Sequence, residues 1–336
     1  MTSRERVIRT IEFKEPDRIP VDLWILPGAR TRHGAAIDLL LDENTTDIVQ
    51  MNGPFDFGYT PAYYQRGSVV DPFGNEWLNV QDGHLGEVRR PAINEDYDNL
   101  SNYEVPINQF LKEWKDYKPT LEKQIQKQRE KDKFILGGWI EVFERLQFLH
   151  GTANMYMDIA EEEPNMFKLI DMMMEFHHVY LDEWLKMDID GVTFGDDWGS
   201  QRGLLISPKK WKEIFKPLYK QLFDKIKNAG KKVFFHSDGY IFDLYPEFID
   251  LGVDVINSQL WCMGVEKVAK EYAGKITFWG EISRQQTLPF GTPADIQASA
   301  DLMKKNLFVN GGLIGQSEAG EDVPLENIEA VLKAWN

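Results

Sequence analysis

The stretch Val-Phe-Phe-His-Ser-Asp-Gly-Tyr at residues 233–240 is an apolar run that stops on a histidine, an acid and a glycine. Such a run is typical of a buried strand, and in parallel α/β folds ligands bind just past the carboxyl ends of the strands. Two other runs are built in the same way, Gly-Val-Thr-Phe-Gly-Asp-Asp at 191–197 and Ile-Thr-Phe-Trp-Gly-Glu at 276–281. Three strands that end in acids or histidine therefore predict an active site.

Short apolar runs alternate with helical segments from residue 130 onward, which is the pattern of parallel strands joined by crossover helices. An eight-stranded TIM barrel needs two more strands than this region supplies, and two earlier apolar runs provide them. We therefore predict a TIM (β/α)8 barrel with an N-terminal helical segment. The expected strands are 19–24, 46–51, 134–138, 191–195, 232–235, 253–257, 276–280 and 312–315.

Residues 66–91 interrupt this alternation with short β runs separated by turn sequences such as Asp-Pro-Phe-Gly at 71–74. They predict a small β meander inserted between the second and third barrel strands, on the carboxyl-terminal face, where it could act as a lid. We expect residues 1–336 to form a single domain that contains this insertion.

Composition and charge exclude several classes of protein. The net charge of −16 repels phosphate backbones, so a nucleic-acid partner is not expected. No apolar run approaches the ~20 residues that span a bilayer, and the first residues lack the apolar stretch of a secretory signal. The single cysteine, Cys262, excludes an internal disulfide and any all-cysteine metal site. We expect a cytoplasmic protein; the oligomeric state stays open, with a homodimer as one possibility because dimers of this fold are common.

Asp196 and Asp197 leave one strand together, so the alternation of side chains points one toward the barrel axis and the other toward the loops. An inward carboxylate at the barrel mouth could serve as a base, a metal ligand or a hydrogen-bond acceptor for substrate. The structural alternative is a carboxylate that caps the following loop or helix.

His236 could be a metal ligand, a general acid or base, or a buried histidine with both nitrogens satisfied. Its position at a strand end, two residues before Asp238, favours a functional role. With Asp238 and with Glu281 from a later strand, it would supply one nitrogen and two oxygens to a mononuclear zinc ion. The five candidate catalytic residues are thus Asp196, Asp197, His236, Asp238 and Glu281, and the candidate metal ligands are His236, Asp238 and Glu281.

Polar and aromatic side chains near other strand ends could orient a small-molecule substrate. No Gly-x-Ser-x-Gly or P-loop sequence is present, so nothing predicts a serine nucleophile or phosphate chemistry. The candidate substrate-binding residues are Trp24, Arg30, Trp198, Gln201, Asn257, Gln259 and Gln316.

Several motifs in order along the chain resemble the uroporphyrinogen decarboxylase superfamily. The resemblance runs nearly end to end and implies a TIM barrel with its pocket at the carboxyl-terminal face. The stretches that carry it are residues 4–7, 16–20, 195–201, 206–208, 236–239, 252–259, 280–285 and 323–327.

Two branches of that superfamily differ from this chain in informative ways. The decarboxylases carry an Arg-Gln-Ala-Gly-Arg stretch after the first strand, whereas this chain retains only Arg30 there, which disfavours a substrate with many carboxylates. The cobalamin-dependent methyltransferases bind zinc through a His-x-Cys motif and a distant cysteine. Here Asp238 replaces the first cysteine, and residues 315–317 lack the second.

The resemblance is strongest to the methyl-donor components of O-demethylase systems, which implies transfer of a methyl group from a small methoxylated or methylated compound to a corrinoid on a partner protein. A cobalt nucleophile would explain the absence of a nucleophilic side chain. Two alternatives remain open: a decarboxylase that uses Arg30 and Arg202, and a non-catalytic barrel that only binds a ligand.

Overall fold

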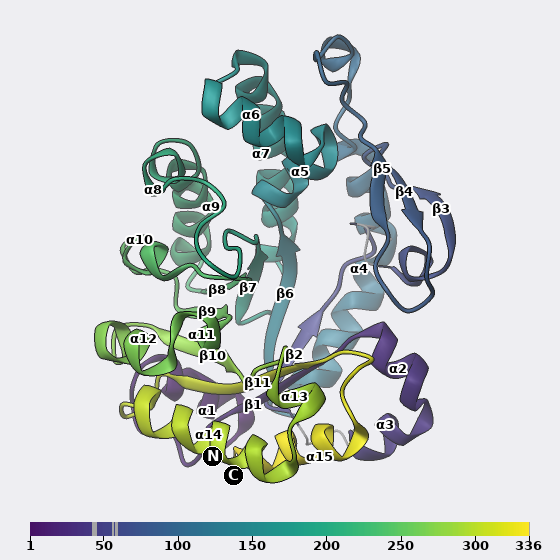
Figure 1. Cartoon of the computed structure of the whole chain (residues 1–336). Helices are drawn as coiled ribbons and strands as arrows, with labels where there is room; N and C mark the ends of the chain where they lie inside the picture. The colour runs from purple at the N-terminus through teal and green to yellow at the C-terminus, as the bar shows by residue number, and fades with distance from the viewer. Residues whose placement is uncertain (42–45, 56, 58–59, 336) are drawn as a thin grey trace.

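The computed structural model describes residues 1–41, 46–55, 57 and 60–335. Within them, eight strands form one sheet in the order β1-β11-β10-β9-β8-β7-β6-β2, and each ladder is parallel. The sheet curls into a nearly closed barrel (Figure 1), which confirms the predicted TIM barrel. Its strands are β1 (Val21–Ile25), β2 (Ile48–Met51), β6 (Phe134–Ile140), β7 (Gly191–Gly195), β8 (Lys232–Ser237), β9 (Val255–Ser258), β10 (Thr277–Glu281) and β11 (Leu313–Ala319).

Helices follow the strands and surround the barrel (Figure 1), and the expected N-terminal helical segment is α1. No helix in the described part of the chain is long and apolar enough to cross a membrane. The α-helices are α1 (Ser3–Ile11), α2 (Pro27–His33), α3 (Ala35–Leu40), α4 (Ile107–Arg129), α5 (Phe143–His150), α6 (Thr152–Glu161), α7 (Pro164–Leu185), α8 (Pro208–Lys210), α9 (Lys216–Asn228), α10 (Tyr245–Asp250), α11 (Leu260–Met263), α12 (Val265–Tyr272), α13 (Thr287–Phe290), α14 (Pro293–Leu307) and α15 (Leu325–Ala334). The shorter helical turns are η1 (Pro61–Tyr64), η2 (Leu100–Asn102), η3 (Trp211–Phe215) and η4 (Phe242–Leu244).

Side-chain alternation along the strands builds two cores. In β8, Phe234 belongs to a cluster inside the barrel, whereas Val233 and Phe235 belong to the larger core beneath the helices. Val7 and Ile11 of α1 join the inner cluster, so the first helix packs against the barrel interior. The same alternation turns His236 back to the inner side of β8, at its carboxyl end.

Three aspartates at the amino ends of strands tie neighbouring strands together. Asp47, Asp190 and Asp254 precede β2, β7 and β9, and each carboxylate accepts a hydrogen bond of 2.8 Å from a backbone N–H of the adjacent strand. Arginine or lysine side chains neutralise all three aspartates. The bond from Val21 N–H to Asp47 also joins β1 to β2, where the sheet closes.

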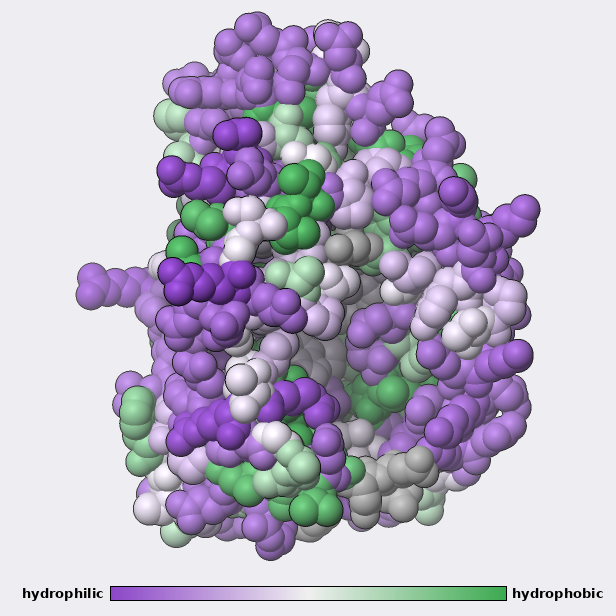
Figure 2. All heavy atoms as spheres, turned by 90° about the vertical axis from the view of Figure 1, so that its right-hand side faces the viewer, coloured by the Kyte–Doolittle hydropathy of each residue, from purple (hydrophilic) through white to green (hydrophobic). Residues whose placement is uncertain are grey.

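Residues 66–91 contain a separate antiparallel sheet, β3 (Gly67–Val70), β4 (Glu76–Asn79) and β5 (Glu87–Arg90), in the chain between β2 and β6. It stands beside the barrel at the right of Figure 1. Figure 2 shows that side of the molecule as largely hydrophilic with scattered hydrophobic patches. Trp77 of β4 and Phe73 of the turn between β3 and β4 are by contrast almost fully buried.

Candidate active site

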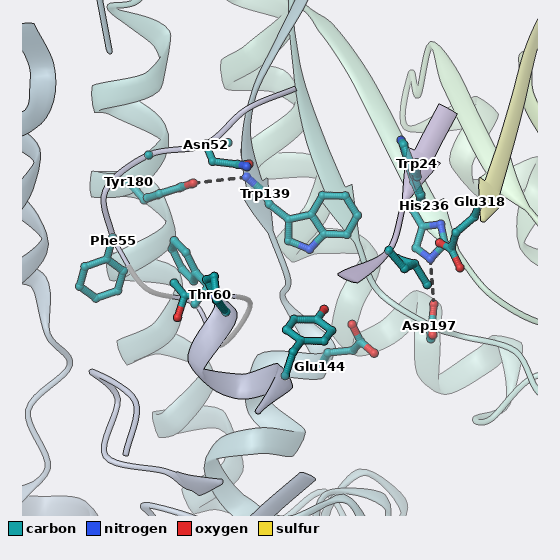
Figure 3. A pocket seen from close by; sticks show the side chains of 16 residues that line it. Trp24, Asn52, Phe55, Thr60, Trp139, Glu144, Tyr180, Asp197, His236 and Glu318 are labelled. Carbon is teal, nitrogen blue, oxygen red and sulfur yellow. Dashed lines mark hydrogen bonds and ion pairs between the residues drawn. The ribbon is translucent and has the colours of Figure 1, made fainter. Parts of the chain in front are cut away.

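A cavity of about 620 Å³ lies at the carboxyl ends of the barrel strands. Figure 3 shows Phe55 and Tyr180 toward one end of it, His236 and Asp197 toward the other, and Trp139 between them. The described residues that line it are Trp24, Leu26, Asn52, Gly53, Phe55, Phe57, Thr60, Pro61, Tyr64, Gly138, Trp139, Glu144, Tyr180, Asp197, His236 and Glu318.

His236 is held by a chain of amide hydrogen bonds. Its Nδ1 lies 2.6 Å from Asn257 Oδ1, and Asn257 Nδ2 donates to Trp279 O at 2.6 Å and to Gln316 Oε1 at 3.0 Å. Because Asn257 uses its N–H groups on these two acceptors, its oxygen must accept from His236, so Nδ1 carries a proton. The other ring nitrogen, Nε2, is therefore the one available for chemistry at the cavity.

Two carboxylates face this nitrogen. Nε2 of His236 lies 3.6 Å from Asp197 Oδ1 and 3.6 Å from Asp238 Oδ1. Burial lowers the pKa of His236, but the charges of Asp238 and Asp197 outweigh it and raise the pKa above its ordinary value. Burial and the charge of Asp238 raise the pKa of Asp197. The imidazole and the two carboxylates thus form one charged cluster at the cavity.

The loop after β8 brings Asp238 into this position through close backbone packing. Asp238 N–H donates to Asp197 Oδ1 at 2.7 Å. Gly239 has φ of +78°, and a Cβ atom there would lie 2.1 Å from the carbonyl oxygen of Gly199. A side chain at position 239 would push the two loops apart, so this glycine is required for the approach of the two acids.

Asp197, His236 and Asp238 have the composition of a metal site, since one ligand atom from each lies within 4.8 Å of the others. One imidazole nitrogen and two carboxylate oxygens suit zinc, and the amide chain on Nδ1 leaves Nε2 free to bind. The set differs from the predicted one, because Asp197 takes the place of Glu281.

Glu281 is drawn instead to Arg284, which sequence reasoning did not single out as a site residue. Arg284 Nε lies 3.4 Å from Glu281 Oε2, and its other nitrogens contact Asp238 and Glu318. Burial raises the pKa of Glu281 to about 8, although Arg284 opposes the shift. One partly buried guanidinium therefore contacts three carboxylates.

Asp196 points away from the cavity and corrects the prediction that both aspartates line a reacting centre. Its oxygens accept hydrogen bonds of 2.8 Å from the backbone N–H groups of residues 142, 143 and 144, and one of 2.6 Å from Tyr219 Oη. Burial raises the pKa of Asp196 to about 7, against these hydrogen bonds. Asp196 fixes the start of α5, which is the capping alternative, while Asp197 faces the cavity.

The predicted substrate-binding residues divide into three groups. Trp24 lines the cavity, with its ring centroid 5.5 Å from that of His236. Asn257 accepts a hydrogen bond from His236 and donates one to Gln316, so these two residues fix the imidazole ring. Gln259 accepts a hydrogen bond from Gln201 at 2.8 Å, outside the cavity lining.

Trp198 and Arg30 do not belong to the cavity. Trp198 is fully buried and stacks on Phe143 at a centroid distance of 4.1 Å, so it is a core residue. Arg30 is 53% exposed on α2 and pairs with Asp38. The sequence did not show that Trp198 and Arg30 lie outside the cavity. Both residues lie in segments whose direction depends on packing.

Several lining residues were missed. Trp139 follows a Gly-Gly pair at the end of a predicted strand, and Glu144 opens the next helix, so both matched the strand-end signal used for the other candidates. Glu318 lies at the end of β11. Burial and the neighbouring acids Asp197, Glu141 and Asp196 raise the pKa of Glu144 well above its usual range.

Residues 134–336 match the family model described as uroporphyrinogen decarboxylase (URO-D). Among solved structures, a methyltransferase from Methanosarcina mazei superposes with a TM-score of 0.73 and 15% sequence identity, covering 99% of this chain and 98% of that one. A Bacteroidetes-affiliated GH5 cellulase shares 10% identity over 70% of this chain and 76% of its own, with a TM-score of only 0.38. No curated protein matches the sequence.

Proposed function

Since the chain belongs to the uroporphyrinogen decarboxylase family, we propose that it is a methyltransferase that moves a methyl group from a small methylated or methoxylated compound to a corrinoid carried by a partner protein. The barrel shared with the methyltransferase from Methanosarcina mazei agrees with this reaction type. The observation that carries the proposal is the cavity itself. It has aromatic walls, an imidazole with a defined free nitrogen, and no lysine or arginine among its described lining residues.

The charge of the lining argues against decarboxylation of a porphyrinogen. Its described ionisable residues are His236 and the acids Glu144, Asp197 and Glu318. A substrate with several carboxylates would meet repulsion there, because carboxylates need arginine or lysine partners when they leave water. Arg284, which contacts the lining residue Glu318, is already shared by three acids of the protein.

The roles of the site residues follow from the chemistry of methyl transfer. The corrinoid acceptor would supply the nucleophile, so the protein has to hold the donor and stabilise the group that leaves. If the methyl group is on oxygen, protonated His236 could donate a hydrogen bond from Nε2 to the departing oxygen. We assign Asp197 and Asp238 to keep His236 charged, and Asn257 and Gln316 to fix its ring.

A divalent cation fits the same three side chains. Asp197, His236 and Asp238 would hold it, and it would act there as a Lewis acid on the oxygen of a methoxy group. Asp238 would then have to share its carboxylate between the cation and Arg284.

The test is methyl transfer to free cob(I)alamin, followed by the absorbance of the methylated product. With a methoxylated donor, we expect His236→Gln to lower the rate at least ~100-fold, the usual scale for a general acid, and exposed Arg202→Ala to leave it unchanged. Unchanged turnover in the His236 variant would refute its catalytic role. Conversion of uroporphyrinogen to coproporphyrinogen by the protein would refute the proposal as a whole.

A further inference from the structure

The walls of the cavity combine aromatic faces with more acids than bases, because their described residues include three carboxylates and one imidazole, His236, which faces Asp197 and Asp238. Its aromatic residues come from β1, β6, α7 and the segment between β2 and β3, and its acids come from α5, β7 and β11 or the loops that follow them. The aromatic residues are Trp24, Phe55, Phe57, Tyr64, Trp139 and Tyr180, and the acids are Glu144, Asp197 and Glu318.

Trp24 and Trp139 form a corner in this cavity. Their ring centroids lie 6.2 Å apart with an angle of 72° between the planes. Both side chains are only partly buried, so part of each ring remains open to a ligand. Aromatic faces attract cations, and tryptophan attracts them most strongly. Figure 3 shows Glu318 beside His236, and Glu144 farther down in the same space, below Trp139.

Glu144 is available to balance the charge of a ligand. Its backbone N–H donates to Asp196, which places the residue at the start of α5 with its side chain lining the cavity. Within the described residues, its carboxylate makes no salt bridge, whereas Glu318 is paired with Arg284. A cationic ligand beside Glu144 would favour its ionised form, against the burial and the neighbouring acids that raise its pKa.

We infer that the methyl donor is an onium compound, a small molecule whose methyl groups sit on a positively charged nitrogen, bound between the Trp24 and Trp139 rings and Glu144. This inference rests on the proposed methyl transfer and narrows its substrate class. A quaternary ammonium group has no N–H, so it binds through aromatic faces and carboxylates at a distance, which is what the cavity offers.

The chemistry balances without an additional reactant. The carbon–nitrogen bond breaks with its electron pair left on nitrogen, and the methyl carbon forms its new bond with the electron pair of the cobalt nucleophile. The amine leaves uncharged, so His236 would not have to act on it as an acid, and the ~100-fold loss expected for His236→Gln applies to a methoxylated donor only. The positive charge of the donor passes to the methylated acceptor.

The test compares two probes of nearly equal shape. Choline carries a trimethylammonium group, and 3,3-dimethylbutan-1-ol carries the uncharged carbon analogue. Calorimetric titration of the full chain should show choline binding about tenfold more tightly than the alcohol. Equal affinity, or binding of the alcohol alone, would overturn the inference.

Two variants locate the site. Glu144→Gln should weaken choline binding about fivefold and leave the alcohol unaffected, while Glu213→Gln on the exposed surface should change neither. If Glu144→Gln weakened the binding of both probes equally, the cause would be a change in cavity shape and not the loss of charge, and the inference would fail. Circular dichroism checks that each variant is folded.

The outcome is separable from that of the proposed function. Tight binding of choline without methyl transfer to cob(I)alamin from any donor would support the onium site and contradict the methyltransferase proposal. Methyl transfer from an uncharged methoxy compound, with no binding of choline, would support the methyltransferase proposal and contradict the onium site.

Discussion

At the amino ends of its strands the barrel surrounds buried aspartates with arginine and lysine, whereas at the carboxyl ends carboxylates gather around a cavity with fewer cations. Asp47 accepts ion pairs from Arg6 and Arg18, and hydrogen bonds from these residues and the backbone hold its pKa below the usual value despite burial. Glu281, at the other end, has a pKa raised to about 8. The first arrangement stabilises the fold with ionised acids, whereas the second favours the protonated form of Glu281.

The largest effect is expected from Asp47→Asn. The change leaves two arginines, one of them buried, without their common partner, and breaking a buried pair in this way costs about 3–5 kcal/mol. Urea denaturation measures the loss. If the variant lost less than about 1 kcal/mol, the amino-terminal ion pairs would not stabilise the barrel and the contrast between its two ends would fail.

Asp196→Ala tests a structural acid that lies next to a cavity acid. It leaves Tyr219 Oη and three buried backbone N–H groups without a hydrogen-bond acceptor, which should lower the free energy of unfolding by about 2–3 kcal/mol. Asp197→Ala, in contrast, removes a carboxylate whose pKa burial has raised, and should leave stability within about 1 kcal/mol of the parent. Equal losses in both variants would contradict the division of roles.

The pH dependence of stability gives a third test, with Glu281→Gln as the probe. The unfolded chain releases the proton of Glu281 near pH 4.5, while the folded protein keeps it until about pH 8. This group therefore makes the protein lose stability as pH rises from about 4.5 to 8, with no further change above. The glutamine variant lacks the titration, so its free energy of unfolding should rise relative to that of the parent over this window, by up to about 5 kcal/mol.

Urea midpoints at several pH values between 5 and 9 provide the measurement. If the difference in free energy of unfolding between variant and parent stayed constant with pH, Glu281 would already be ionised at pH 5 and held in that form by Arg284.

The smallest effect is expected from Arg30→Ala. Its ion pair with Asp38 is exposed on both sides, and such pairs contribute less than about 0.5 kcal/mol. Because Arg30 is outside the cavity, choline binding should also be unchanged in the calorimetric titration. A clear loss of binding would return Arg30 to the site and reopen the decarboxylase alternative.

Much of the barrel could be predicted from the sequence. All eight predicted strands overlap observed ones, because parallel strands buried on both faces leave continuous apolar runs in the sequence. The strand-end rule also found His236, Asp197 and Trp24. The rule also selected Asp196, which points away from the cavity, because it detects the end of a strand and not the direction of each side chain.

The sequence by itself determined the period of the strands, and hence that polar residues at 196–197, 236–238 and 281 would follow buried runs. Only the tertiary structure decided which of them meet. The tilt and stagger of the barrel bring Asp197 to His236, turn Asp196 toward α5, and place Arg284 between Glu281, Asp238 and Glu318. Alternation is a local property of one strand, whereas these contacts join residues from different strands, whose relative positions are set by closure of the whole sheet.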